Sequence, residues 1–114
     1  MANEQGRALD ALGDPTRRRV LELLHGGEHT VRELTDALPI SQPAVSQHLR
    51  VLREAGLVAA RPEGARRLYR VDLDGLAEVR AYVDAFWDDV LTAFVRHTEI
   101  AGPAAGPTTP EEDR

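Results

Sequence analysis

The sequence contains no cysteine and no lysine, and it has no long uninterrupted apolar run. The lack of cysteine excludes a disulfide framework and any metal site built from thiolates. The lack of a long apolar run excludes a membrane-spanning helix, and the N-terminus does not have the charged and then apolar composition of a signal peptide. We therefore expect a cytoplasmic protein that has no membrane partner.

The remaining composition is typical of one small domain. The chain has 114 residues, of which 42% are hydrophobic, and this is enough for a core of modest size. Residues 102–114, GPAAGPTTPEEDR, are rich in Pro and Gly and then acidic. We expect residues 1–101 to form one folded domain and residues 102–114 to form a disordered tail.

The net charge of −5 by itself argues against a nucleic-acid partner, but the charges are unevenly distributed. Residues 41–71 hold six Arg and two acidic residues, whereas residues 72–114 hold three Arg and ten acidic residues. A local basic surface of this kind is what binding to phosphates requires. A solvated Arg-rich edge is the less favoured interpretation, because the excess coincides with the helical hairpin described next.

The stretch from Thr30 to Val58, TVRELTDALPISQPAVSQHLRVLREAGLV, predicts two short helices joined by a tight turn. Thr30 with Glu33 forms a capping-box pattern, and Ser41 precedes a second helix whose first turn holds a proline. Gly56 stands where that helix would end in a left-handed residue. Two short helices around such a turn are typical of a DNA-binding helix-turn-helix, although an ordinary solvated helical hairpin fits this stretch about equally well.

The second helix has an apolar stripe of Val45, Leu49 and Leu52, and the residues facing away from this stripe are those expected to contact DNA. Amide and hydroxyl groups can hydrogen-bond base edges, and an arginine can read guanine or hold a phosphate. The predicted DNA-contacting residues of this segment are Ser41, Gln42, Ala44, Ser46, Gln47 and Arg50.

Residues 57–62 and 66–71 are predicted to be two short strands joined by Glu63-Gly64-Ala65. This hairpin would be a wing lying over the DNA backbone or minor groove, with Arg61, Arg66 and Arg67 clustered at its base and tip. The alternative is a solvated hairpin tip.

Three further helices are predicted, over residues 3–12, from Pro15 after an Asp14 cap, and from Asp72 or Asp74 to about His97. Arg17, Arg18 and Arg19 of the second helix are expected to be mainly solvated, with a backbone contact from one of them as the alternative. The last helix is strongly apolar and aromatic, which is typical of a subunit interface and predicts a homodimer. The predicted interface residues of this helix are Val83, Phe86, Trp87, Val90 and Phe94; packing within one chain is the less favoured alternative.

The segments ALGDPTRRRVLELL, SQPAVSQHLRVLREAGLV and RRLYRV together resemble the ArsR/SmtB-type winged helix-turn-helix regulators. This resemblance covers residues 8–71 closely and the following helix loosely. It implies a mainly α fold with a small β-hairpin and a homodimeric bacterial transcription regulator. It also implies that the first helix, through Leu9 and Leu12, lies beside the last helix at the dimer interface.

The family's metal sites are incomplete in this chain. Arsenical and cadmium sensors of the family carry a Cys-Val-Cys-like motif, for which this chain has Thr30, Val31 and Arg32, so soft-metal sensing there is excluded. Zinc and nickel sensors place ligand pairs on the last helix, where this chain has Phe86 and Ile100 at two of the four positions. His97 and Glu99 remain candidate ligands for nickel or zinc.

No catalytic arrangement is recognisable, since the sequence has no Gly-rich phosphate loop, no HExxH motif and no cysteine nucleophile. We therefore expect a sequence-specific dimeric regulator of promoter DNA, modulated by a ligand or by a protein co-regulator, and not an enzyme. Two alternatives stay open: a winged-helix protein-interaction module, and a regulator that responds to nickel or zinc through His and carboxylate ligands.

Overall fold

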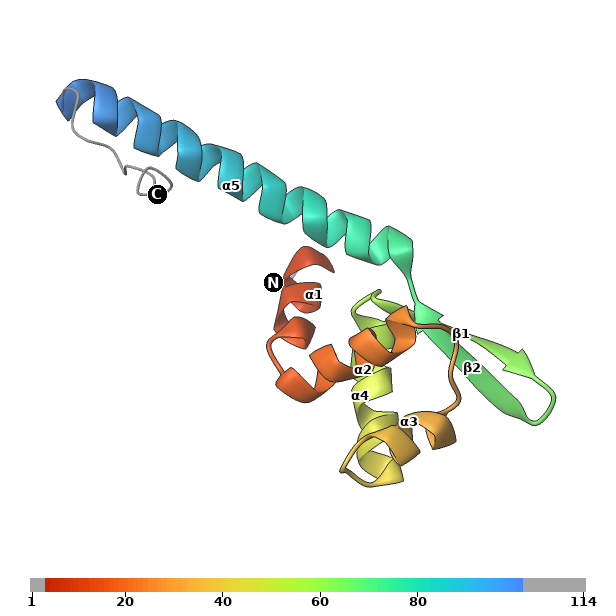
Figure 1. Ribbon diagram of the computed structural model, residues 1–114. Helices are drawn as coiled ribbons and strands as arrows, with labels where there is room; N and C mark the ends of the chain where they lie inside the picture. Colours follow the sequence, from red (N-terminus) through yellow and green to blue (C-terminus); the bar gives the residue numbers. More distant parts are fainter. Residues whose placement is uncertain (1–3, 102–114) are drawn as a thin grey trace, which may run out of the picture. The chain divides into compact units, whose positions relative to one another are not determined.

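The computed structural model describes the backbone of residues 4–101 and the side chains of residues 6–97. It is mainly helical with one two-stranded antiparallel hairpin, as the sequence predicts (Figure 1). The elements in chain order are α1 (Glu4–Leu12), α2 (Pro15–His25), α3 (Val31–Ala37), α4 (Gln42–Glu54), β1 (Val58–Glu63), β2 (Arg66–Val71) and α5 (Leu73–Ala101). The chain divides into two compact units between Arg80 and Ala81. The predicted tail lies outside the described residues.

Side-chain caps fix where three of the helices begin. Asp14 accepts hydrogen bonds from the backbone N–H groups of Thr16 and Arg17, at 2.7 and 3.1 Å. Thr30 and Glu33 form the predicted capping box, each side chain accepting from the other residue's backbone N–H. Ser41 Oγ accepts from Ala44 N at 3.3 Å. Because each cap satisfies N–H groups that have no partner inside the helix, these short local patterns determine the helix starts.

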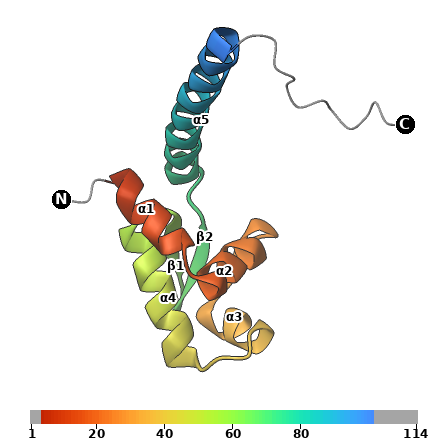
Figure 2. The ribbon, with the colours of Figure 1, turned by 90° about the vertical axis from the view of Figure 1, so that its left-hand side faces the viewer.

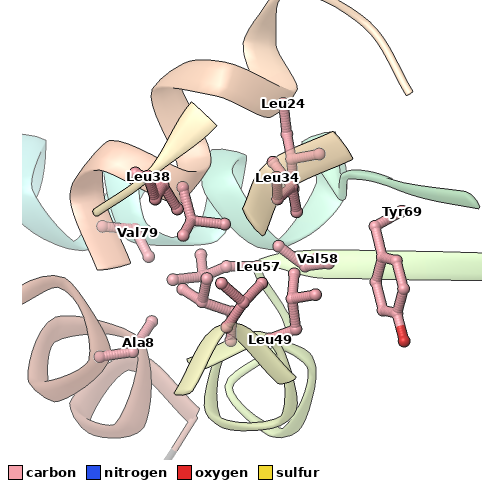
Figure 3. Close-up of a cluster of buried hydrophobic side chains, with 13 residues drawn as sticks. Ala8, Leu24, Leu34, Leu38, Leu49, Leu57, Val58, Tyr69 and Val79 are labelled. Atoms are coloured by element: carbon pink, nitrogen blue, oxygen red, sulfur yellow. The ribbon is translucent and has the colours of Figure 1, made fainter. Parts of the chain in front are cut away.

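One hydrophobic core holds the first unit together, and Figure 3 shows its central side chains. α1, α2, α3 and α4 all contribute to it, and so do the two strands and the first turns of α5. The apolar stripe predicted for α4, Val45, Leu49 and Leu52, is almost completely buried. Figure 2 shows α1 to α4 grouped around this core. Burial of the stripe fixes the rotation of α4 about its axis, and this decides which residues it exposes.

The two strands pair in register, so that Val58 lies opposite Val71 and Glu63 lies opposite Arg66. The connecting turn is therefore shorter than predicted, with β1 beginning one residue later and ending one residue later than expected. His29 pairs with Tyr69 on the other edge of β2, through hydrogen bonds of 3.1 and 2.8 Å. This third short pairing connects the wing to the loop that precedes α3.

The last helix begins at the predicted place, where the Asp72 carboxylate accepts from the N–H groups of Asp74 and Gly75. It continues to Ala101, beyond the end expected near His97. Its first turn lies so close to the backbone at the end of α4 that a Cβ at Gly75 would overlap the carbonyl of Gly56. Gly56 itself has a φ of +81°, which confirms the predicted left-handed end of α4. Among the described residues, no helix has the length and apolar character needed to cross a membrane.

Two of the three consecutive arginines of α2 bind backbone, one more than the alternative considered from the sequence. Arg17 Nε donates to the carbonyl of Ala11 at 2.8 Å, and Arg18 Nη1 donates to the carbonyl of Leu12 at 2.7 Å. The last carbonyls of α1 have no partner in their own helix and carry partial negative charge. Because α2 begins only three residues after α1 ends, its first-turn arginines can reach these carbonyls. Arg18 remains exposed despite this contact, and Arg19, which is also exposed, pairs with a glutamate of its own helix at 3.6 Å.

Candidate nucleic-acid interface

The exposed side of α4 carries most of the residues predicted to contact DNA. Gln42, Ser46, Gln47 and Arg50 are exposed, while the opposite side of the helix is buried in the core. Arg50 Nη2 donates a hydrogen bond to Gln47 Oε1 at 3.0 Å. This contact holds the two neighbouring side chains in one arrangement and leaves the Gln47 amide N–H groups available as donors. An amide beside a guanidinium can bind adenine and guanine edges in a major groove.

The first turn of α4 contributes differently from its middle. The Ser41 side chain is exposed, and its oxygen already accepts the capping hydrogen bond, which leaves its hydroxyl hydrogen and one lone pair for another partner. Ala44 is half-buried and can offer only its methyl group. Gln42 lines a pocket shared with the wing rather than lying with Gln47 and Arg50. The predicted α4 residues thus divide between the exposed helix face and this pocket.

The wing arginines do not form the single cluster that the sequence suggested. Successive residues of a strand point to opposite faces, so Arg66 and Arg67 face opposite sides of the hairpin. Arg66 Nη2 lies 3.9 Å from Glu63, and Arg67 forms no hydrogen bond or ion pair among the described residues. Among the three predicted wing arginines, Arg67 is therefore the one with its full charge available to a phosphate.

Arg61 is held in place by a residue outside the wing. Its guanidinium donates two hydrogen bonds to the Glu28 carboxylate, at 3.0 and 2.9 Å. This hydrogen bonding lowers the pKa of Glu28 below its ordinary value of 4.5, and it raises the pKa of Arg61. The bidentate pair connects β1 to the loop before α3 and neutralises one of the three predicted phosphate contacts.

The predicted dimer-interface residues of α5 are exposed in the single chain. Phe86 and Trp87 expose 61% and 56% of their surface, and Val83, Val90 and Phe94 are exposed as well. On α1, Leu9 exposes 36% of its surface, whereas Leu12 is half-buried and packs against the chain's own core. The apolar surface available to a partner therefore comes mainly from α5.

The candidate metal ligands are not brought together within the described part of the chain. His97 is exposed on α5, and the side chain of Glu99 lies outside the described residues. No group of three or more His, Asp or Glu side chains placed to hold a metal ion occurs among the described residues. His48, expected to be structural, is half-buried, and its Nδ1 lies 3.5 Å from Arg17 Nη1.

Residues 14–60 match the family described as "bacterial regulatory protein, arsR family". The chain is 48% identical over 96 residues to the HTH-type transcriptional regulator Rv2034 of Mycobacterium tuberculosis. The aligned residues cover 84% of this chain and 90% of that relative. It resembles the solved structure of an ArsR-like transcriptional regulator from Rhodococcus with a TM-score of 0.80 and 25% identity, over 88% of this chain and 94% of the other.

A homodimeric winged helix-turn-helix DNA-binding domain from Mycobacterium bovis is also similar, with a TM-score of 0.62 and 33% identity over 77% of this chain and 82% of that one. The fold, the capped helical hairpin and these similarities agree, and the relatives are regulators without enzymatic activity. The chain therefore belongs to the arsR family of bacterial regulatory proteins, and it is a DNA-binding transcriptional regulator rather than an enzyme.

Proposed function

We propose that two copies of this chain bind an inverted-repeat operator in promoter DNA, with α4 of each copy in the major groove. The observation that carries this proposal is the Gln47–Arg50 pair on the exposed face of a helix whose opposite face is fully packed. Because α4 cannot rotate without exposing its apolar stripe, these side chains reach the groove in a fixed orientation. Two-fold symmetry would place the two recognition helices about 34 Å apart, or at a multiple of this distance.

The wing would bind the DNA backbone beside the major groove. Arg67 is best suited to this role, since it has no partner among the described residues, and Arg66 has only a distant carboxylate at 3.9 Å. Arg61 would have to give up its bidentate contact with Glu28 before it could bind a phosphate. We therefore expect Arg61 to contribute least to DNA affinity.

The second copy would cover the apolar face of α5. Large aromatic side chains left in water are costly, and aromatic residues are enriched at protein interfaces. The homodimeric state of the similar Mycobacterium bovis domain supports this assignment. A co-regulator protein is the alternative occupant of this face. In that case this chain would be monomeric on its own and would associate only with the co-regulator. We place the protein in the cytoplasm, where bacterial DNA is found.

The proposal is tested with fluorescence anisotropy, using a labelled duplex from the gene's own promoter and a scrambled duplex of equal length. Arg50→Ala and Gln47→Ala should each weaken promoter binding by about 1–3 kcal/mol and change scrambled-duplex binding much less. Arg19→Ala removes one exposed arginine outside the proposed interface and serves as the charge control. Equal affinity of the parent chain for both duplexes would exclude sequence-specific binding.

A further inference from the structure

A pocket of about 480 Å³ lies between the start of α3, the start of α4 and strand β2. Its lining includes Val31 and Arg32 of α3, Gln42 of α4, and Arg67 and Tyr69 of β2. Volumes of about 300–1,000 Å³ are typical of pockets for small organic ligands. The pocket is therefore large enough for a molecule of one or two rings, and all its walls belong to the first compact unit.

Part of the pocket wall is apolar. Tyr69 is largely buried, and Figure 3 shows its ring at the edge of the core cluster. Val31 is half-buried and packs against the core from α3. The hydroxyl of Thr30 also borders the pocket, but it is already used in capping α3. A ligand would meet an aromatic ring, a branched aliphatic side chain and one hydroxyl group.

The rest of the wall carries positive charge that the protein itself does not neutralise. The side chains of Arg32 and Arg67 are exposed and form no hydrogen bond or ion pair with any described residue. Arg66 borders the pocket as well, but its guanidinium lies 3.9 Å from Glu63. Two available guanidinium groups suit a carboxylate, a sulfonate or a phosphate ester, which they can bind through paired N–H donors.

We propose that this pocket binds a small organic anion with a flat apolar body, and that bound anion competes with DNA. The apolar wall would hold the body of the ligand, and Arg32 and Arg67 would hold its acidic group. Competition follows because Gln42 and Arg67 are residues that we assign to DNA contact. The competition with DNA rests on the proposed function, whereas binding of the anion to the free protein does not.

Isothermal titration calorimetry of the full chain with three probes tests the site. The probes are 2-naphthoate, which has both the body and the charge, 2-naphthamide, which has the body alone, and inorganic phosphate, which has the charge alone. We expect saturable binding of 2-naphthoate at one site per chain and much weaker binding of the other two. Arg32→Gln and Arg67→Gln should each weaken 2-naphthoate binding about tenfold, while Arg19→Gln should not change it.

Three results would overturn the site. Equal affinity for 2-naphthamide would show apolar adsorption without charge recognition. Equal affinity for inorganic phosphate would show a site for the DNA backbone only. Unchanged 2-naphthoate binding in both arginine variants, with circular dichroism confirming that they are folded, would place the ligand elsewhere.

The competition is tested separately with labelled promoter duplex. A concentration of 2-naphthoate ten times its own Kd should raise the apparent Kd for DNA about tenfold, with sodium acetate at equal ionic strength as the control. Unchanged DNA affinity under these conditions would refute competition. If the chain bound no DNA specifically, the proposed function would fail, but the calorimetric result for the free protein would still stand.

Discussion

Replacing Phe86 with Ala should weaken self-association of the chain strongly. Complete burial of a phenylalanine side chain contributes about 1.5–3 kcal/mol, and Phe86 exposes 61% of its surface in the single chain. Covering that fraction contributes about 1–2 kcal/mol per copy, and a two-fold interface contains the residue twice. The dimer should therefore lose about 2–4 kcal/mol, which raises its dissociation constant about 30- to 1,000-fold.

Sedimentation equilibrium over a dilution series measures this constant directly. Asp88→Ala is the matched control, because Asp88 lies two residues further along α5 and so about 200° around the helix from Phe86. It is exposed, and its substitution should leave the dissociation constant unchanged. Circular dichroism checks that both variants keep the helical content of the parent chain.

Two results would contradict the reasoning. A Phe86→Ala chain that dimerises as tightly as the parent would show that α5 does not form the interface and would favour α1 around Leu9 instead. An Asp88→Ala chain that loses dimerisation equally would show that the effect comes from the helix as a whole and not from its apolar face.

Three further predictions concern the first unit. Gly75→Ala should destabilise the fold by about 1–3 kcal/mol, more than the gain from helix propensity, because the new Cβ overlaps a backbone carbonyl; an undiminished melting temperature would refute this close approach. Arg66→Ala and Arg67→Ala should weaken binding to all DNA sequences alike and reduce the salt-dependence slope by about one unit per lost phosphate contact; an unchanged slope would leave the wing in solvent. Arg61→Gln should lower the melting temperature at neutral pH, and the difference from the parent should vanish as the pH falls below 4.5 and through the lowered pKa of Glu28, since the pair stabilises the fold only while that carboxylate is charged. A difference that persisted at low pH would show that Arg61 acts through packing.

The helical hairpin could be predicted because its signals lie within a few residues of each other. The Thr30–Glu33 capping box, the Ser41 cap and the Gly56 terminus are each local patterns, and all three occur where the sequence placed them. The apolar stripe of α4 repeats at helical spacing and is buried accordingly. The predicted end of α5, near His97, is several residues too early. The helix continues to Ala101 because no glycine or proline stands between these two residues.

The contacts that sequence reasoning missed depend on how separate elements of the chain pack against one another. Arg61 binds Glu28 across 33 positions, and no periodicity or cap pattern relates the two. Arg17 and Arg18 bind carbonyls of the preceding helix, which requires the angle between α1 and α2 to be known. The role proposed for Arg32 depends likewise on β2 lying beside α3, a proximity that the pairing of His29 with Tyr69 establishes.

These pairings change what the charge count of the sequence means. Residues 41–71 hold six Arg and two acidic residues, but Glu28 lies outside this range and neutralises Arg61 within it. Glu63 reduces the effective charge of Arg66 in the same way. Arg67, on the opposite face of the hairpin, keeps its charge and shares a pocket with Arg32, an arginine that the range does not include. Arg32 and Arg67 therefore add positive charge beside the pocket between β2, α3 and α4, and this charge would attract an anion, whether a DNA phosphate or a small ligand.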